Sequence, residues 1–456
     1  MSLITSLISG RVYSYEEAFR AKDITSDAMK EAISEWHRLF FQDTPDKEED
    51  PCQRIPYAVV SKLTKTAFAE YSVDSDDQFL RQVLDALDEH KEEAMYAAMT
   101  GGRAFLKPYA TKNGIAFSVV PRPRILVFGK DDQGRPTDVG LVEWTTDRNN
   151  YYTLLERRTI GADGRLTIRN QLYRAPNKDT VGVPVSLTAL EKYAGLPDEY
   201  TYPVPMGLGL ADVRCPVPNS VDGSLDPVAV FASATGLIHN INHNEWQLSR
   251  EFELGRSRAI VSSDLLAVDQ SGKRRTLRDD LFVALDEDPG DLGITIFSPA
   301  LREQSFLARK TEYLRNVESL IGIKRGLLSE VEETQKTATE VTSSVGDYAM
   351  TINAFQEMWE KAAKAACVLA GVIGKLYRVP GAHEISQEDV VIDWGNGLMY
   401  DEDKTWADYM AMVAAGMIRP EIALAWKFSL PWETPEDLTA IREKYMPELS
   451  ALAGAV

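Results

Sequence analysis

Apolar residues near the N-terminus recur at the three- and four-residue steps that place side chains on one face of a helix. This apolar stripe consists of Met29, Ile33, Trp36, Leu39 and Phe40. Ser26 and Asp27 precede the stripe, and both residue types accept hydrogen bonds from the free N–H groups at a helix start. The same spacing returns from about Asp77 and stops before Gly101. The pattern therefore predicts one helix in each of these two regions.

From Arg103 to about Arg174 the pattern alternates with a period of two residues. Turn-forming pairs such as Asn113-Gly114 and Asp163-Gly164 separate the alternating runs. The runs are rich in β-branched and aromatic residues and span 104–109, 115–120, 125–128, 139–145, 151–156 and 166–173. This alternation predicts an antiparallel meander. Residues 175–224 hold many prolines and glycines, and we expect an irregular connection there.

Two further helical patterns enclose a short insert. Asp226-Pro227 is a strong helix start, and the apolar stripe that follows ends at Gly255. The second pattern opens at Ser298-Pro299 and ends at Gly322. Between them, residues 258–298 contain short apolar strands, a basic turn and an acidic turn. We expect a small α/β domain at the end of a helical hairpin.

The longest helical pattern in the chain runs from Thr337 to Tyr377, on the order of 60 Å if it is unbroken. A loop at 324–336 precedes this helix, and a lone strand at 390–394 follows it. Three more helices are expected at 403–416, 420–428 and 435–445. Helices and antiparallel strands in this order predict an α+β fold.

The composition excludes some classes of protein. The chain has 456 residues, enough for about two to four domains. Its 69 acidic residues outnumber 50 basic ones, which gives a formal net charge of −19. This charge argues against a surface that grips nucleic acid as a whole, because such binding needs clustered cations. The chain contains no apolar run of about 18 residues, so we expect no membrane-spanning helix.

The cysteines and the N-terminal segment indicate in which cellular compartment the protein is made. Cys52, Cys215 and Cys367 are widely spaced and odd in number, and none belongs to a C-x-x-C pair. This spacing argues against a disulfide framework and a zinc ribbon, and favours a reducing compartment. The apolar run at 1–10 has no preceding positive charge and no clear cleavage site, so we interpret it as a helix or arm. We therefore expect a soluble protein that is intracellular when it is made.

Motifs for catalysis are incomplete. Gly371-Val372-Ile373-Gly374-Lys375 lacks the spacing and the hydroxyl residue of a phosphate-binding loop and lies in a helical pattern. His239 and His243 have the spacing with which one helix face chelates a metal, or presents two imidazoles to solvent or to a neighbour. The carboxylates Asp401–Asp403 would suit a nuclease, but compensation of a helix dipole explains them better. We expect no catalytic residue, no cofactor and no metal.

The order of the parts resembles the portal protein of tailed bacteriophages, the ring at one capsid vertex through which DNA is packaged and ejected. Two helices bracket a small insert, and a loop is followed by the Thr337-Ala338-Thr339-Glu340-Val341 start of a long helix. The C-terminal part is similar too, with the strand Val391-Ile392-Asp393-Trp394, the segment from Asp401 to Ile418, and Trp432-Glu433 before a last acidic helix. The resemblance covers most of the chain.

The resemblance implies a portal-like fold with four kinds of domain: a mixed wing with an antiparallel meander, long stem helices, a small α/β clip and a helical C-terminal crown. The implied boundaries are the wing at 1–224, stem helix 1 at 225–257, the clip at 258–298, stem helix 2 at 299–322, the tunnel loop at 323–338, the long tunnel helix with the return strand of the wing at 339–400, and the crown at 401–456.

The resemblance also implies a homo-oligomeric ring of about twelve copies, with double-stranded DNA passing through it without sequence specificity. Its expected protein partners are the terminase large subunit, a head–tail adaptor, and the major capsid and scaffold proteins, with no membrane. The protein would lie at the capsid vertex of the virion, and in the host cytoplasm during assembly. The acidic charge agrees with this role, because like-signed walls do not hold the phosphate backbone.

The resemblance and the charges indicate contact residues at three places. Those near the channel are Lys324, Arg325, Glu330, Glu332, Glu333 and Lys336, which make the tunnel loop net acidic and argue against a strong cationic grip. Clip contacts for partners are expected at Lys273, Arg274, Arg275, Asp286 and Asp288, with a solvated turn as the alternative for the three basic residues. Stem contacts between subunits are expected at Trp246, Phe252, Phe306 and Tyr313, for which packing within one subunit is equally consistent.

Two other functions stay open on the sequence. A metal-dependent nuclease would use the two helix histidines and the carboxylates at 401–403. A different virion morphogenesis or scaffold protein would explain the acidic, helix-rich composition without needing a clip.

Overall fold

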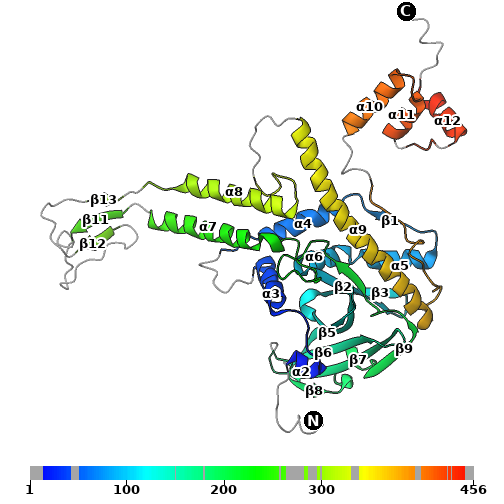
Figure 1. The fold of residues 1–456 in the computed structure, drawn as a ribbon, viewed down its shortest axis with the longest axis horizontal. Helices are drawn as coiled ribbons and strands as arrows, with labels where there is room; N and C mark the ends of the chain where they lie inside the picture. Colours follow the sequence, from blue (N-terminus) through cyan, green and yellow to red (C-terminus); the bar gives the residue numbers. More distant parts are fainter. Residues whose placement is uncertain are drawn as a thin grey trace, which may run out of the picture. The chain divides into compact units, whose positions relative to one another are not determined.

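The computed structural model describes residues 14–42, 51–148, 150–177, 180–255, 258–262, 282–285, 295–297, 300–329, 338–395, 402–428, 430–432 and 434–446. The chain divides into two compact units, Met1–Asp393 and Trp394–Val456. The described part of the first unit combines helices with mainly antiparallel sheets, and that of the second is helical (Figure 1). The mixed helix-and-sheet class expected from the sequence is confirmed.

Within the described residues, the helices before the first long strand are α2 (Tyr15–Phe19), α3 (Asp27–Phe41), α4 (Ile55–Ala67), α5 (Gln78–Asp88) and α6 (Lys91–Gly101). The predicted first helix is α3, and Ser26 caps it by accepting a hydrogen bond from the Met29 N–H at 3.2 Å. The predicted second helix is wrong as a single element, because α5 ends at Asp88 and α6 begins at Lys91. Helix α4 was not expected, although Pro56 at its start is a typical signal.

The predicted meander is confirmed as strands but forms two sheets. Strand β2 (Arg103–Ala110) pairs with β3 (Ile115–Pro121) on one side and with β10 (Ala211–Arg214) on the other, in a three-stranded sheet. The larger sheet has the order β4-β5-β6-β7-β8, with β9 also paired to β7. Its strands are β4 (Ile125–Lys130), β5 (Pro136–Asp147), β6 (Asn150–Ile160), β7 (Arg165–Ala175), β8 (Val183–Val185) and β9 (Glu199–Pro205). The expectation of an irregular connection at 175–224 is therefore wrong for β8, β9 and β10.

The segment that leads into the next helix corrects another prediction. Helix α7 spans Thr235–Leu254 and does not start at Asp226-Pro227. Asp226 is buried and its carboxylate lies 2.5 Å from Lys130 Nζ, so it serves an ion pair in place of a helix cap. The Val230 N–H donates to the Met99 carbonyl at 2.9 Å. These contacts hold the segment in a non-helical path through the body of the unit.

The insert between the two long helices holds a small mixed sheet. Strand β11 (Arg258–Ser262) pairs parallel with β12 (Phe282–Leu285) and antiparallel with β13 (Thr295–Phe297). The sequence predicts both helix and strand in the insert, and the described part of the insert contains strands only. Helix α8 (Glu303–Ile321) begins later than the expected Ser298-Pro299 and ends at Gly322, as expected.

Helix α9 (Ala338–Leu376) confirms the longest helical prediction. Gly371 lies where an added Cβ would meet the His383 carbonyl oxygen at 2.8 Å, so the glycine-rich stretch permits close packing of the following segment. That arrangement supports helix packing over phosphate binding for 371–375. The lone strand is β14 (Ile392–Asp393), which pairs antiparallel with β1 (Ser72–Val73).

The C-terminal unit contains α10 (Glu402–Ala414), α11 (Pro420–Lys427) and α12 (Pro435–Tyr445), which confirms the three predicted helices. Arg442 joins α12 to α11 by donating from Nε to the buried Glu421 carboxylate at 2.7 Å. Tyr409 stacks on Trp426, with ring centroids 5.1 Å apart. These contacts join the three helices of the unit.

The cysteines are buried thiols. Cys52, Cys215 and Cys367 are unpaired. Burial raises the pKa of Cys215 and of Cys367 to about 12, so both stay protonated at neutral pH. No helix within the described ranges is both long and apolar enough to cross a membrane.

Gly102 permits the buried approach of the segment before α7. Its φ is +82°, and an added Cβ would lie 2.2 Å from the Pro227 carbonyl oxygen. We predict that Gly102→Ala lowers the free energy of unfolding by about 2 kcal/mol or more, measured by urea denaturation. Gly114→Ala is the control, because no described atom lies within 4 Å of its added Cβ, and it should change stability by less than about 0.5 kcal/mol. Equal losses in both variants would contradict the role of this close approach.

Candidate functional site

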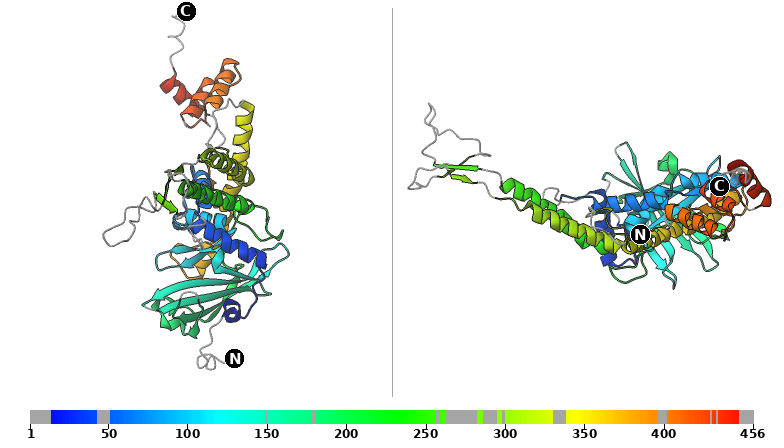
Figure 2. Two further views of the ribbon diagram at one scale, coloured as in Figure 1. Left: turned by 90° about the vertical axis from the view of Figure 1, so that its left-hand side faces the viewer. Right: turned by 90° about the horizontal axis from the view of Figure 1, so that it is seen from above.

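Helices α7 and α8 form an antiparallel pair, which we call the helical projection. Residue 251 of α7 contacts residue 302 just before α8, whereas residue 244 contacts residue 309, so the two helices run in opposite directions. Figures 1 and 2 show the two helices side by side along their length, extending from the sheets of the first unit. The insert at 258–297 lies between them in the sequence.

Polar side chains form the seam between the two helices. Asn244 is fully buried, and its Nδ2 donates to the Phe306 carbonyl at 3.0 Å. Its Oδ1 accepts from Arg309 Nε at 2.7 Å, and the same guanidinium donates to Gln247 Oε1 at 2.5 Å. Both hydrogen-bonding groups of the buried amide are therefore satisfied, as a polar group in this position requires.

Ion pairs continue the seam. Lys310 Nζ lies 2.7 Å from Glu245 Oε2. Farther along α7, Glu251 accepts two hydrogen bonds from the Arg302 guanidinium, at 3.0 and 2.7 Å. The Arg302 side chain lowers the pKa of the Glu251 carboxyl by these hydrogen bonds. The seam therefore depends on charges and amides for much of its length.

Several large apolar side chains of the projection remain on its outside. Phe252 is 43% exposed, Leu254 58%, Leu301 40% and Leu307 45%. Among the four stem residues chosen from the sequence, Phe252 is exposed and Trp246, Phe306 and Tyr313 are half-buried. Trp246 stacks on His243, and Phe306 lies under the guanidinium of Arg309. Among the described residues, the projection thus carries exposed apolar side chains next to aromatic side chains that are only partly covered.

The base of the projection is tied to the N-terminal helices. His239 Nε2 lies 2.7 Å from Glu35 Oε1 on α3, and Asn242 Oδ1 accepts from the Gln53 N–H at 2.9 Å. His243 Nε2 lies 3.0 Å from Gln247 Nε2, so the two histidines have separate partners. Among the residues that the structure describes, no group of three or more His, Cys, Asp and Glu side chains is arranged to hold a metal ion.

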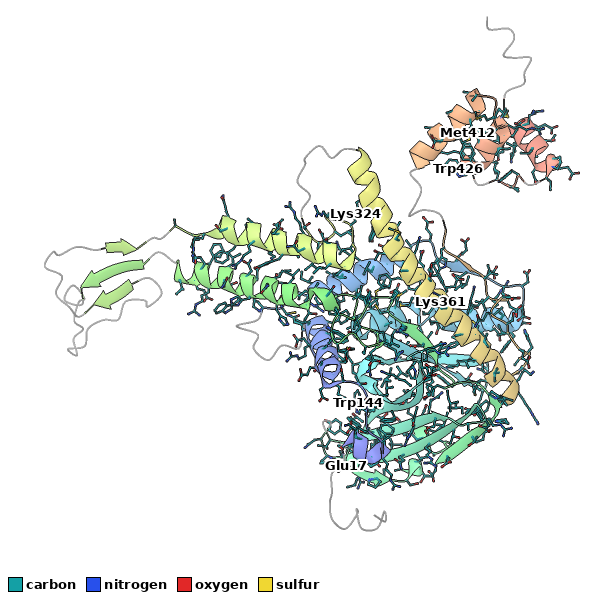
Figure 3. All side chains as sticks on the ribbon, in the orientation of Figure 1. Glu17, Trp144, Lys324, Lys361, Met412 and Trp426 are labelled. Carbon is teal, nitrogen blue, oxygen red and sulfur yellow. The ribbon has the colours of Figure 1, made fainter. Side chains whose placement is uncertain are left out.

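A compact turn, residues 322–329, follows α8. The buried Glu318 carboxylate accepts hydrogen bonds from three backbone N–H groups of this turn and from the Ser329 hydroxyl. Lys324 and Arg325 lie on the turn with exposed side chains. The structure therefore places these two predicted residues next to each other on one turn, and Figure 3 labels Lys324.

Other predicted site residues lie outside the described residues. They are Glu330, Glu332, Glu333 and Lys336 of the loop, and Lys273, Arg274, Arg275, Asp286 and Asp288 of the insert. Asp401 also lies outside the described residues, and α10 begins at Glu402.

Sequence reasoning missed Asn244 and Glu318. Asn244 lies between Ile241 and Leu248 on the apolar stripe of α7, and Glu318 lies between Leu314 and Ile321 on that of α8. A polar residue at a core position of a helix is the signal that would have found them.

We predict that Asn244→Ala destabilises the projection by about 1–3 kcal/mol, because the Phe306 carbonyl and the Arg309 guanidinium would lose a buried partner. Hydrogen exchange of the α7 and α8 amides measures this change. Asn240→Ala is the matched control, because Asn240 is an exposed asparagine of the same helix, and it should leave exchange unchanged. Equal exchange in both variants would show that the seam does not hold the helices together.

Comparison with known proteins identifies the family. A family model described as "Phage portal protein, SPP1 Gp6-like" matches residues 68–444. No curated protein matches the chain. One chain of a solved structure titled "Neck of native GTA particle computed with C12 symmetry" is 13% identical, with a TM-score of 0.43 over 94% of this chain and 98% of its own length. That similarity is too distant to support an inference about function. The family match spans most of the sequence, and the chain therefore belongs to the phage portal protein family.

Proposed function

We propose that this chain assembles into a closed ring of about twelve identical subunits at one vertex of the virion, and that double-stranded DNA enters and leaves the capsid through the ring. In this proposal α7 and α8 form the stem, the insert at 258–298 is the clip, the turn after α8 leads into the tunnel loop, and the C-terminal helices form the crown. Membership of a family of structural proteins supports a place in the virion.

The observation that carries the proposal is the apolar surface of the helical projection. Among the residues that the structure describes, Phe252, Leu254 and Leu307 of this helix pair are 43%, 58% and 45% exposed. Surface of this kind on an extended element is typical of a contact with another subunit. A head-to-tail contact repeated by rotation closes into a ring, so one neighbouring copy on each side would cover these side chains.

Net charge supports the passage of DNA. Each subunit contributes a formal charge of −19, so a ring of such subunits has an acidic surface overall. An acidic bore repels the phosphate backbone within about a Debye length, 8–10 Å at physiological salt. DNA would then move along the channel without being held by it, whereas a basic wall would bind it.

The insert is proposed as the docking site for the terminase large subunit during packaging and for a head–tail adaptor afterwards. Its position in the sequence, between the two helices of the projection, supports a place at the end of the stem. The basic residues Lys273–Arg275 and the acidic residues Asp286 and Asp288 are the proposed contacts. Major capsid and scaffold proteins would contact the ring during assembly in the host cytoplasm.

We predict that the double variant Phe252→Asp/Leu307→Asp folds but fails to form rings, because a charge at each position would be buried without a partner in the subunit contact. Light scattering measures the mass of the particle, and a view down its axis by electron microscopy shows whether an annulus forms. Thermal unfolding of the variant subunit should change little, since both side chains are exposed within the chain.

The control for this experiment is Ser249→Asp/Ser305→Asp, which adds the same charge at exposed polar positions of the same two helices. Rings should form in the control. If the wild-type chain stays monomeric even with capsid and scaffold proteins present, the proposal is wrong.

A second prediction concerns the clip. Reversal of the three basic residues, Lys273→Glu/Arg274→Glu/Arg275→Glu, should leave rings intact and block DNA packaging, because the charge that meets an acidic partner is inverted. Packaged DNA is measured by its protection from nuclease. The control reverses three exposed lysines elsewhere, Lys65, Lys112 and Lys361, and should package normally. Normal packaging by the clip variant would contradict the docking role.

A further inference from the structure

Glu318 occupies a position where a helix normally places an apolar residue. It lies on α8 between Leu314 and Ile321, on the buried stripe, and is itself fully buried. A buried carboxylate is costly unless hydrogen-bond donors surround it. Glu318 therefore needs a specific set of donors in the folded chain.

The donors come from the turn that follows α8. Glu318 Oε1 accepts from the N–H groups of Gly326 at 3.1 Å, Leu328 at 2.6 Å and Ser329 at 2.9 Å. Its Oε2 accepts from the Ser329 hydroxyl at 2.8 Å. Hydrogen bonds to an ionised acceptor are stronger than those between neutral groups. A single side chain thus orders the last residues of the turn.

Other contacts hold the same turn at its start and middle. Gly322 ends α8 in the left-handed conformation, with φ +76°, and its carbonyl accepts from the Thr351 hydroxyl of α9 at 2.9 Å. The Lys62 ammonium of α4 donates to the Leu327 carbonyl. The turn is therefore attached to three helices, and Glu318 supplies most of the hydrogen bonds to its second half.

Lys324 and Arg325 lie between these attachment points. Both side chains are exposed, on the segment between Gly322 and the anchored Gly326, and Lys324 is labelled in Figure 3. Their backbone is held on both sides, so the two cations are presented at a defined place. The carboxylate of Glu318 accepts hydrogen bonds from the backbone of the turn. It is therefore used by the backbone and does not neutralise the charges of Lys324 and Arg325.

We propose that Glu318 is a positioning residue that presents Lys324 and Arg325 to the phosphate backbone of DNA in the channel. This inference rests on the proposed function. Two cations per subunit, fixed in an otherwise acidic ring, would make brief point contacts with the duplex and would not grip it along its length. Loss of the carboxylate would release the second half of the turn and spread the two cations over many positions.

The first experiment tests the anchor. Hydrogen exchange of the full-length chain, read on peptides that cover 323–329, should be about tenfold faster or more in Glu318→Gln, because bonds to a charged acceptor become bonds to a neutral one. The matched control is Glu312→Gln, an exposed glutamate on the same helix, and should exchange like wild type. If Glu318→Gln does not fold, Ser329→Ala removes only the hydroxyl contact and should give a smaller acceleration. Unchanged exchange at the turn in the folded variants would overturn the anchor.

The second experiment tests positioning. Rings of Glu318→Gln and of Lys324→Ala/Arg325→Ala should form, and both should package less DNA than wild type. The triple variant Glu318→Gln/Lys324→Ala/Arg325→Ala should package as much DNA as the double variant Lys324→Ala/Arg325→Ala. A residue that acts only through two others has no further effect once those two are removed. A merely structural role for Glu318 would instead give additive losses. Faster exchange with wild-type packaging would overturn the positioning role, as would a further loss in the triple variant.

The two proposals fail in different ways. A wild-type chain that forms no ring would contradict the proposed function, and the exchange experiment would still decide whether Glu318 anchors the turn. Rings that package DNA normally in every Glu318, Lys324 and Arg325 variant would leave the portal function intact and remove this inference.

Discussion

The neighbours of the helical projection in the described part of the chain leave several of its large apolar side chains exposed. Each of its two helices contacts the other along one face and reaches the body of the unit only near its base. The contact between them is made in large part by Asn244, Arg309 and the ion pairs farther along. Apolar side chains such as Phe252 and Leu307 lie on the outside of the helix pair. In the proposed ring, a second copy of the chain covers this surface.

Buried carboxylates fix the path of the chain where it enters the helical projection, before α7, and where it leaves the projection, after α8. Asp226 pairs with Lys130 and keeps the segment before α7 out of the helix, so α7 leaves the body at Thr235. At the other end, Glu318 fixes the turn after α8. Apolar burial alone would tolerate small shifts of both segments, whereas a desolvated carboxylate requires its donors at particular positions. These carboxylates specify where the projection begins and where the chain goes after it.

Most of the secondary structure could be predicted from the sequence, because long apolar stripes and alternating runs have few interpretations. The stripe of α3 and that of α9 were each predicted almost to the residue. The start of α7 was not, because Asp226-Pro227 has the form of a helix cap and only its contact with Lys130 shows its other use. Short strands such as β8 were missed, since three residues are too few to show a period. The family resemblance came from the order of elements and is confirmed by the family match.

The exposed residues of the candidate site could be predicted from the sequence, whereas the buried residue that holds them in place could not. Lys324 and Arg325 stand out in the sequence as cations beside an acidic loop, but their common turn depends on a carboxylate that resembles any other glutamate of α8. Helix α8, with 19 residues from Glu303 to Ile321, follows the insert in the sequence and carries Glu318 in its last turn. In the proposed portal this helix lies along the chain between the docking site and the cations of the turn, and Glu318 is the residue at which the helix meets the turn.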